Sequence, residues 1–480
     1  MATALLALLA TAGHGNTRLV PTSYPTIQQG IFASTAGDTV LVLPGTYVEN
    51  ILIDRDVAVK SAEGPAVTVI DGGSPPDPFL GSVVRMSAGS IEGFDICNGR
   101  GSFPGPANGW RGGGILVTEG EAPGVLIQNN WIHDNRVVAQ SGVAEGGGIA
   151  ILQTAVARVI SNRIFDNRLE NTSMSGGAEG TAIRDRGLLP ETRIDRNEIF
   201  DNSGMIPNWN ESFRFFGAIV CGEGTVSGNL VACNMAAEAP GIYGTGVVEG
   251  NTVVANWSLS EDSAVIVVGF LDQFARATNN NICLNVGPGL DCLSQTHTTT
   301  FIVECNNLFG NGPGGQIVGD CSGAIGQNGN ISVDPEFARG ACPSTHGDWC
   351  LGPESSLLPD HSPPGCGLIG ALGECPPIAV PEVELPRPGV FWALDPRPNP
   401  FAVRTSIPFH LGEPAPVEIT IYGVMGRKVR TLRAGYLGAG NHELVWDARD
   451  DGGRRAAAGG YVAAIRAGRD EVTRTLLLVW

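Results

Sequence analysis

Lysine is almost absent from this chain of 480 residues, which contains only Lys60 and Lys428. Lysine and arginine together number 30 against 48 acidic residues, so the formal net charge is −18 and the sequence pI is about 4.8. A field of that sign repels nucleic acids and bare anionic membrane surfaces. It also disfavours strongly acidic polymers as ligands, unless calcium or a cluster of arginines intervenes. We therefore expect no nucleic-acid partner.

Apolar runs long enough to cross a membrane are also missing. Met1–Ala12 is almost wholly apolar and ends in the small-x-small sequence Ala10-Thr-Ala12, but it is too short to span a bilayer. We interpret residues 1–15 as a signal peptide, although basic residues are absent from its start and Met1 need not be the true N-terminus. The mature chain is therefore expected to have no transmembrane segment and to be secreted or held at the surface of a bacterium.

Helical periodicity is missing from the centre of the chain, because Gly, Asn, Pro or Asp interrupts it every five to eight residues. What is present is a repeat, Asn-x-Φ-x-x-Asn, in which Φ is Ile, Val or Leu. The first asparagines of its seven copies are about 29 residues apart (176 residues over six intervals), a period typical of solenoids. The copies are residues 130–135, 162–167, 197–202, 229–234, 251–256, 280–285 and 306–311.

The residues of the repeat favour strands over other solenoid types. Ile and Val dominate at Φ, and no leucine consensus precedes the asparagine, which argues against leucine-rich repeats. We predict an all-β fold, a parallel β-solenoid whose coils each point the Φ side chain inward and turn at the asparagines. Asparagine tolerates positive φ, and its amide can bond the asparagine of the next coil in a ladder. The alternative is that asparagine only marks loops.

Both ends of the repeat region fit this fold. Apolar residues at helical spacing in residues 24–33 predict a helix that caps the open end. Gly37-Asp-Thr-Val40 with Pro44-Gly-Thr-Tyr-Val-Glu49, and later Asp334-Pro-Glu-Phe337 with Leu351-Gly-Pro-Glu-Ser355, are similar to the first and last coils of a known superfamily. On these motifs, residues 22–375 resemble the right-handed parallel β-helix proteins of the pectate-lyase-like superfamily. The resemblance implies a right-handed parallel β-helix and implies nothing about activity.

Eleven cysteines in an exported chain predict disulfides. Zinc is disfavoured because no Cys-x2-Cys pair occurs. Four cysteines fall in the irregular end of the solenoid, four more could join neighbouring coils, and the pairing is left open. Cys97 is our candidate for an unpaired buried thiol, since the total is odd. The two groups are Cys342, Cys350, Cys366 and Cys375, and Cys283, Cys292, Cys305 and Cys321.

The C-terminal part has a different organisation. Residues 376–390 are rich in proline and are predicted to form an extended linker. Residues 391–480 alternate apolar and polar positions between turn signals, which predicts a small antiparallel β-sandwich with Trp446 and Tyr461 in its core. They resemble the flagellar hook-cap-type immunoglobulin-like domain and related C-terminal sorting domains of bacterial surface proteins. Because the chain ends in Leu-Leu-Val-Trp480 without a basic residue, a lasting interaction or spacer module is favoured over cleavable sorting. The matching motifs are Asn399-Pro-Phe401, Ile421 to Val429, Gly440-Asn-His442, Val445-Trp-Asp447, Asp450-Asp-Gly452 and Gly459-Gly-Tyr-Val462.

Residues that flank Φ are expected to face outward and to stack about 4.8 Å apart between coils. Aromatic and charged side chains therefore gather on one face of coils three to five. Such a platform suits the stacking of sugar rings, although the protein's own loops could equally cover it. The position after Φ reads His133, Phe165, Phe200, Ala232, Val254, Cys283 and Phe309, and the position before it begins with Trp131, Arg163 and Glu198.

Insertions leave four coils at the same turn, in residues 99–112, 136–146, 168–180 and 203–217. Insertions at one corner of a solenoid form a single wall, so we predict that a glycan binds between this wall and the adjoining sheet. Loops without a ligand are the alternative. The glycan-binding candidates are Trp110, Arg111, Trp131, His133, Arg136, Arg168, Trp209, Glu211 and Arg214.

Asp134, Asp166 and Asp201 occupy the same place in three successive coils, where their carboxylates would repel one another. Neighbouring arginines such as Arg136 can neutralise them. A Ca²⁺ ion is the alternative, although it needs six to eight oxygens. The sequence requires no metal or cofactor, and Ca²⁺ is the one ion that these residues suggest. The same three aspartates, with His133, are the catalytic candidates, as an acid/base pair or a carboxylate group.

No complete catalytic constellation is present. Neither lysine lies in the candidate cleft, and the paired aspartates and Gly-His-Gly signature of the polygalacturonase branch are absent. We therefore predict a monomeric secreted or cell-surface protein that binds extracellular glycans or cell-envelope components, with the sandwich as anchor or spacer. The alternative is a carbohydrate-active enzyme, either a polysaccharide lyase or a glycoside hydrolase, with its residues in the insertions of coils three to five.

Overall fold

The computed structural model divides the chain into two compact units, Met1–Cys375 and Pro376–Trp480. The predicted linker and most of the predicted signal peptide lie outside the described residues. The structure describes residues 15–73, 75, 77–103, 109–118, 120–172, 177–187, 189–205, 215–244, 246–258, 263–269, 274–294, 299–312, 315–340, 342, 344, 349–375, 391–393, 396, 401, 403–411, 414–423, 427–438, 440–457, 459–468 and 470–478.

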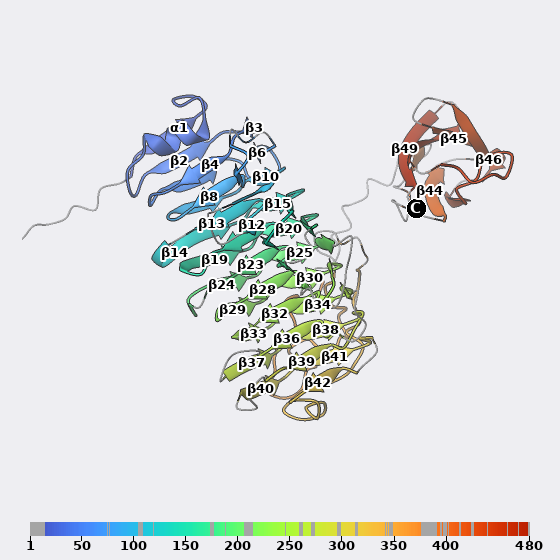
Figure 1. Cartoon of the computed structure of the whole chain (residues 1–480). Helices are drawn as coiled ribbons and strands as arrows, with labels where there is room; N and C mark the ends of the chain where they lie inside the picture. The colour runs from blue at the N-terminus through green and yellow to red at the C-terminus, as the bar shows by residue number, and fades with distance from the viewer. Residues whose placement is uncertain are drawn as a thin grey trace, which may run out of the picture. The chain divides into compact units, whose positions relative to one another are not determined.

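Three long parallel sheets form the first unit, and each successive coil adds one strand to each sheet (Figure 1). The predicted all-β solenoid is confirmed. Sheet A contains β1 (Thr17–Val20), β2 (Thr39–Val42), β5 (Ala58–Ser61), β9 (Ser90–Glu92), β14 (Gly120–Gln128), β19 (Ala155–Ile160), β24 (Arg193–Asp195), β29 (Thr225–Ser227), β33 (Val247–Glu249), β37 (Phe274–Thr278) and β40 (Thr300–Glu304). Sheet B contains β3 (Gly45–Val48), β6 (Thr68–Asp71), β10 (Asp95–Cys97), β15 (Trp131–His133), β20 (Arg163–Phe165), β25 (Glu198–Phe200), β30 (Leu230–Ala232), β34 (Thr252–Val254), β38 (Asn281–Cys283) and β41 (Asn307–Phe309). Sheet C contains β4 (Ile51–Ile53), β8 (Val84–Met86), β13 (Ile115–Val117), β18 (Ile149–Ile151), β23 (Ile183–Asp185), β28 (Ile219–Cys221), β32 (Ile242–Gly244), β36 (Ile266–Val268), β39 (Leu290–Cys292) and β42 (Ile317–Gly319).

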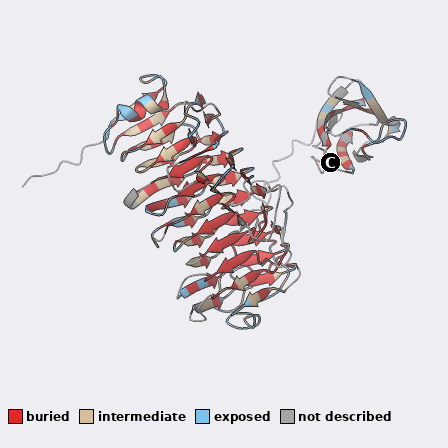
Figure 2. Cartoon of the chain, viewed as in Figure 1, coloured by how far each residue is buried: buried red, intermediate tan, exposed pale blue. Residues whose placement is uncertain are grey.

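The Φ positions of the repeat form one buried column along sheet B. Ile132 pairs with Ile164 in the next coil, and Ile164 pairs with Ile199, so like residues lie directly over one another. Strands in the middle of the unit are buried along most of their length (Figure 2). The column is Ile96, Ile132, Ile164, Ile199, Val231, Val253, Ile282 and Leu308, none of which has exposed surface.

The asparagines of the repeat form two buried ladders, as predicted. In both ladders the Nδ2 of one asparagine donates to the Oδ1 of the asparagine in the next coil, over 2.9 to 3.1 Å. Each amide also donates to a main-chain carbonyl of an earlier coil, for example from Asn162 to Ile127. The ladder formed by the first asparagine of each repeat extends to Asn330. The ladder formed by the second asparagine ends at Gln316, whose side-chain oxygen accepts from Asn311.

Positive φ was expected at the asparagines of the repeat, and this expectation is wrong. Positive φ belongs to the residue before each asparagine, such as Asn129, Ser161 and Asp134, and not to the ladder asparagines themselves. The left-handed residue bends the chain sharply, and this bend directs the following asparagine inward, where it joins the ladder.

The N-terminal end is covered by helix α1 (Ile27–Phe32), within the segment for which helical spacing was noted. Thr26 caps the helix by accepting a hydrogen bond from the Gln29 N–H at 3.2 Å. The Glu49 carboxylate accepts hydrogen bonds from the N–H groups of Ile27 and Gln28. Ile27 and Ile31 are buried against the first coils, so the helix closes the end of the core.

The predicted insertion loops are in part strands, which is a correction to the sequence-based expectation. From β12 and β16 onward they stack in parallel from coil to coil as two further sheets with a small core of their own, whereas β11 pairs antiparallel with β7 and β12. Sheet D contains β7 (Leu80–Gly81), β11 (Gly101–Ser102), β12 (Gly109–Arg111), β17 (Val143–Glu145), β22 (Ala178–Glu179) and β27 (Phe215–Phe216). Sheet E contains β16 (Arg136–Ala139), β21 (Arg168–Asn171), β26 (Ser203–Met205), β31 (Met235–Ala236) and β35 (Trp257–Ser258). The small core comprises Val137, Ala139, Ala144, Leu169, Ala178 and Ala237.

Glycine returns the chain from each insertion to sheet C. Gly112, Gly146 and Gly180 have φ of 61°, 63° and 71°, at equivalent places in three coils. A Cβ at Gly146 would lie 2.2 Å from the carbonyl oxygen of Ile149, so no other residue fits this turn without displacing the backbone.

The described parts of residues 334–375 fold back over the outer face of sheet B, and we name them the C-terminal strap. Phe337, Trp349 and Leu372 of the strap pack on the outward side chains of strands β25, β30, β34 and β38. Ala371 N–H also donates to the Thr252 hydroxyl at 3.0 Å. The sequence analysis left open that the protein's own loops cover this face. Part of the face is indeed covered, but by the C-terminal strap, which lies far along the chain.

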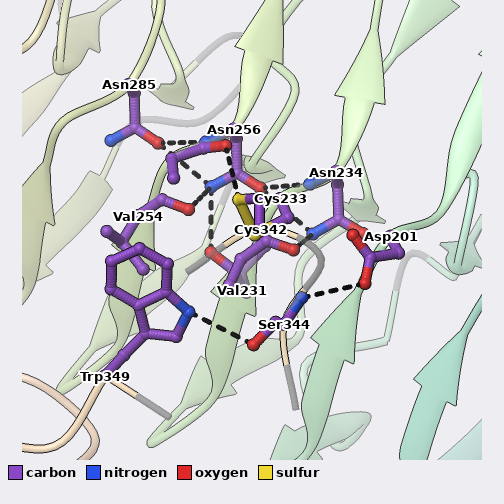
Figure 3. Close-up of a disulfide and its surroundings, with 12 residues drawn as sticks. Asp201, Val231, Cys233, Asn234, Val254, Asn256, Asn285, Cys342, Ser344 and Trp349 are labelled. Carbon is purple, nitrogen blue, oxygen red and sulfur yellow. Dashed lines mark hydrogen bonds between the residues drawn. A yellow bond between two sulfur atoms is a disulfide. The ribbon is translucent and has the colours of Figure 1, made fainter. Parts of the chain in front are cut away.

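Four disulfides form among the described residues, and three of them tie the end of the unit to its coils. Cys283, expected to join coils, is a free buried thiol because it points into the apolar contact beneath the strap. Cys97 is free and buried as predicted. Cys221, for which no prediction was made, is also a free buried thiol. The pairs are Cys233–Cys342 (Figure 3), Cys292–Cys321, Cys305–Cys366 and Cys350–Cys375.

The second unit is a small antiparallel sandwich, as predicted. Trp446 has no exposed surface and packs between Phe401 and Tyr461, so Trp446 and Tyr461 belong to the core. One sheet has the order β43 (Phe391–Ala393), β44 (Thr405–Leu411), β47 (Gly440–Trp446). The other has the order β46 (Lys428–Leu437), β45 (Ala415–Gly423), β48 (Gly459–Ala467), β49 (Asp470–Leu478).

Candidate functional site

A cleft of about 660 Å³ opens where the first insertion meets sheets B and E, and we name it the Trp110 cleft. Trp110 on β12 and Arg136 on β16 contribute to its lining, and Asp134 lies at the turn before β16. Trp110 of the first insertion therefore meets Asp134 and Arg136, which come from the next coil and are two residues apart in the sequence. The full lining is Gly73, Pro75, Pro78, Asn98, Gly99, Arg100, Trp110, Asp134, Arg136 and Val138.

An aromatic cluster supports one side of this cleft. The Trp110 ring lies 6.2 Å from the Phe79 ring with an interplanar angle of 19°, and 5.8 Å from the Phe103 ring. Phe79 remains 57% exposed. Trp110 also packs against the small core of sheets D and E, which holds the indole in a fixed orientation. A flat ring held in this way beside polar groups is the usual partner of a sugar ring's apolar face.

The charged groups of the cleft are partly committed to the protein. Arg136 forms a two-point pair with Glu170, with nitrogen to oxygen distances of 2.9 and 2.6 Å, yet its side chain is 59% exposed. Asp134 is exposed and contacts His133. Arg100 and Asn98 complete the polar lining. The cleft thus offers cationic, anionic and amide groups around one aromatic ring, a mixed set that can bind several hydroxyls.

His133 is held between two carboxylates. Its Nε2 lies 2.9 Å from Asp95 Oδ1, its Nδ1 lies 2.8 Å from Asp134 Oδ2, and its ring stacks on Phe165 at 4.6 Å. Burial lowers the pKa of His133, but the two carboxylates outweigh burial, so the pKa is raised above its usual value. Both ring nitrogens are occupied, which argues against the predicted acid/base role of His133 with Asp134.

Replacing His133 by Gln is expected to reduce stability more at pH 5 than at pH 8.5. A raised pKa means that the contribution of His133 is fully present below the unfolded pKa and is lost as pH rises through the folded pKa. The measurement is urea unfolding of both proteins at the two pH values. Loss of the contact with Phe165 lowers the unfolding free energy equally at both pH values. If the stability difference between the two proteins were the same at pH 5 and pH 8.5, the raised pKa of His133 would be contradicted.

Trp131 and Arg163 form a second, smaller platform on sheet B. The Arg163 guanidinium lies 5.4 to 5.5 Å from the ring centroids of Trp131, Phe165 and Phe200, and its Nε is 3.2 Å from Glu198. The arginine is therefore occupied by its own neighbours. An adjoining cleft of about 320 Å³ is lined by Asn129, Asn130, Trp131, Ser161, Asn162, Arg163, Arg196 and Glu198.

The C-terminal strap covers Asp201, the third member of the predicted aspartate column (Figure 3). Ser344 N–H donates to Asp201 Oδ2 at 3.0 Å. Burial raises the pKa of Asp201 to about 7, against the opposing hydrogen bond from Ser344 and with a further rise from Asp166. Asp166, by contrast, is exposed. The column therefore does not act as three equivalent carboxylates.

Other candidates lie away from the Trp110 cleft. Arg111 was expected to bind a glycan, but it is 2% exposed and pairs with buried Glu145, because the strand β12 turns alternate side chains inward. Arg168 is exposed one coil beyond Arg136 and directly beside it in register. Trp209, Glu211 and Arg214 lie outside the described residues.

Several residues of this surface were missed by sequence reasoning. Phe79, Asn98 and Arg100 come from the first coils, before the repeat becomes regular, and no periodic signal marks them. Trp257 is 60% exposed on sheet E. Trp257 directly follows the second asparagine of a repeat, as Arg136 and Arg168 do. This equivalence was the sequence signal that could have identified it.

Across the part of the chain that the structure describes, no group of three His, Cys, Asp or Glu side chains gathers as metal ligands would. Calcium at the aspartate column therefore stays a prediction. No described helix has the length and apolar character needed to cross a membrane.

The second unit resembles a known family. Residues 402–471 match the family model of the FlgD Ig-like domain. The FlgD Ig-like match spans β44 to β48 and includes the Trp446 and Tyr461 core, so the predicted immunoglobulin-like resemblance is confirmed for this part of the chain. No curated protein matches the chain.

Proposed function

We propose that this protein is a secreted or cell-surface β-solenoid of the pectate-lyase-like type that binds an extracellular glycan in the Trp110 cleft. The observation that carries the proposal is the fixed indole of Trp110 beside Arg136, Arg100 and Asp134 in one open cleft of about 660 Å³. Aromatic faces with surrounding hydrogen-bonding groups are what a sugar requires.

The surface beyond the cleft supports binding of an extended polymer. In sheet E, successive coils place Arg136, Arg168, Ser203, Met235 and Trp257 in one outward column. Four coil spacings between Arg136 and Trp257 amount to about 19 Å. We propose that the glycan chain follows this column from the Trp110 cleft and that Trp257 supports its far end.

The location at the cell surface has independent support. Four disulfides among the described residues indicate an oxidising environment. The FlgD Ig-like match places a small separate domain after the solenoid, as an anchor or spacer would be placed. We propose export through the N-terminal signal peptide and retention at the bacterial envelope by this domain, with the solenoid acting as a monomer.

A carbohydrate-active enzyme is the second candidate. The raised pKa of Asp201, about 7, suits a general acid. Against it, Ser344 and the strap occupy Asp201, and His133 has both ring nitrogens engaged. Assays for reducing ends and for unsaturated products with the polymer that the protein binds would distinguish the two candidates, and turnover would establish the enzyme.

Trp110→Ala is expected to weaken binding of the best glycan on an array by about 10- to 30-fold, as loss of a central aromatic contact does. Because Trp110 also packs on the small core, Arg136→Gln serves as a second variant with a more exposed side chain. The measurement is titration calorimetry with the selected oligosaccharide. Phe274→Ala, an exposed aromatic on sheet A, is the matched control, and equal losses in Phe274→Ala and Trp110→Ala would remove the cleft from consideration.

A further inference from the structure

The acidic charge of the chain is confined to its first unit. Residues 1–375 contain 17 Lys and Arg against 37 Asp and Glu, a formal charge of −20. Residues 391–480 contain 12 against 9, a formal charge of +3. The domain with the FlgD Ig-like match is thus a basic part of an acidic protein.

The basic excess of this domain comes from two short segments. Residues 427–430 and 447–455 together contain six Lys and Arg against three Asp, whereas the remainder of residues 391–480 is balanced at six against six. The fold joins these segments, because Asp451 N–H donates to the Val429 carbonyl at 3.0 Å and the Asp451 carboxylate accepts from Thr431 N–H at 3.1 Å. The loop after β47 therefore sits on the edge strand β46.

A cleft of about 380 Å³ lies between the two segments, and we name it the basic cleft. Its charged lining consists of four cations and two carboxylates. They are Arg427, Lys428, Arg454, Arg455, Asp450 and Asp451.

The carboxylates of the basic cleft are engaged mainly with the main chain. Asp450 Oδ1 accepts hydrogen bonds from the N–H groups of Gly452 and Arg454, both at 2.9 Å, which holds the turn. The ion pairs are long, 3.6 Å for Lys428 with Asp451 and 3.5 Å for Arg454 with Asp450. Arg427 is exposed and forms no ion pair within the described part of the chain. Arg427 and Lys428 therefore have donor groups left for a ligand.

The charge of the basic cleft selects the ligand class. Four cations and two carboxylates leave a formal charge of +2. A carboxylate carries one negative charge, whereas a phosphomonoester carries about 1.5 to 2 near neutral pH and presents three acceptor oxygens. Guanidinium groups pair with such oxygens in a two-point geometry. A single carboxylate would leave one of the two excess positive charges of the cleft uncompensated.

We propose that the basic cleft binds a phosphomonoester on a glycan of the cell envelope. The acidic first unit is repelled by the same anionic surface, so this contact would attach the chain through its C-terminal domain. The site is separate from the Trp110 cleft and does not depend on glycan binding there.

The test uses the full chain on three polymers with one backbone: dextran phosphate, carboxymethyl dextran and unmodified dextran at matched substitution. We expect dextran phosphate to bind at least tenfold tighter than carboxymethyl dextran in biolayer interferometry at 150 mM salt. Arg427→Gln is expected to weaken phosphate binding by about five- to tenfold, the effect of losing one charge-assisted contact. Arg404→Gln, an exposed arginine elsewhere in the domain, removes the same charge and should change binding less than twofold.

Three results would overturn the proposal: equal affinity for the phosphate and carboxymethyl polymers, no binding of dextran phosphate, or equal losses in Arg427→Gln and Arg404→Gln. If Trp110→Ala abolishes phosphate binding while Arg427→Gln does not, the ligand occupies the solenoid cleft instead. Arg454→Gln repeats the test should Arg427→Gln unfold.

Discussion

Asn202→Ala is expected to lower the free energy of unfolding by about 4 kcal/mol. The Asn202 side chain donates to Asn234 Oδ1, at 2.9 Å, and to the carbonyl of Ile164, at 2.8 Å. It also accepts from the main-chain and side-chain N–H groups of Asn167, at 3.1 and 2.9 Å. Its removal leaves buried groups in two neighbouring coils without partners, and each such group costs about 1 to 3 kcal/mol. Urea unfolding followed by circular dichroism provides the measurement.

Asn129→Gly is the matched control for the ladder. Asn129 is exposed, has a φ of 56°, and makes one long bond of 3.4 Å to Glu92. Glycine adopts positive φ freely, so the change should cost less than about 1 kcal/mol. If Asn202→Ala were as mild as Asn129→Gly, the ladders would be a consequence of coil stacking rather than a source of its stability.

The double variant Cys233→Ala, Cys342→Ala is expected to lose about 4.8 kcal/mol of stability, the chain-entropy value for its loop. The two cysteines are 109 residues apart, and this is the longest loop among the described disulfides. Removal of Cys350–Cys375, with a separation of 25, should cost about 3.5 kcal/mol by the same relation. Thermal unfolding of both variants checks the prediction: removal of Cys233–Cys342 should destabilise the protein more than removal of Cys350–Cys375.

Loss of Cys233–Cys342 also has a local signature. With the strap no longer tied beside it, Asp201 should regain solvent, and its pKa should fall from about 7 toward the usual carboxyl value near about 4. Carboxyl carbon shifts in NMR titrations of the oxidised protein and of the double variant report this change. An unchanged pKa would show that the strap stays in place without its disulfide, held by the packing of Trp349.

The regular coils could be predicted because each repeats one local rule. Ile132, Ile164 and Ile199 are the Φ residues of three successive repeats, so one alignment of the repeats gives the strand register for all three. The insertions lack such a phrase, and their pairing as sheets D and E depends on contacts such as Val137 with Leu169 in the next coil. The position of positive φ was mistaken because Asn129 and Asn130 are equally suitable residues for a tight turn.

The sequence placed some of the candidate residues near one another. Trp110, Arg136 and Asp134 meet in one cleft, as expected of insertions at a common corner. Arg111, next to Trp110, instead pairs with buried Glu145, and a sequence cannot show which neighbour in a short irregular strand points inward.

By itself, the sequence determined the solenoid and its register, since the Φ residues and the paired asparagines are local features that recur in every coil. It also determined the C-terminal sandwich, whose alternating pattern matches the FlgD Ig-like family model. Only the tertiary structure decided which part of the outer face is open, because the strap reaches Asp201 from Ser344, 143 residues along the chain. Contacts over such a separation depend on the path of the whole chain, which leaves no periodic signal in the sequence.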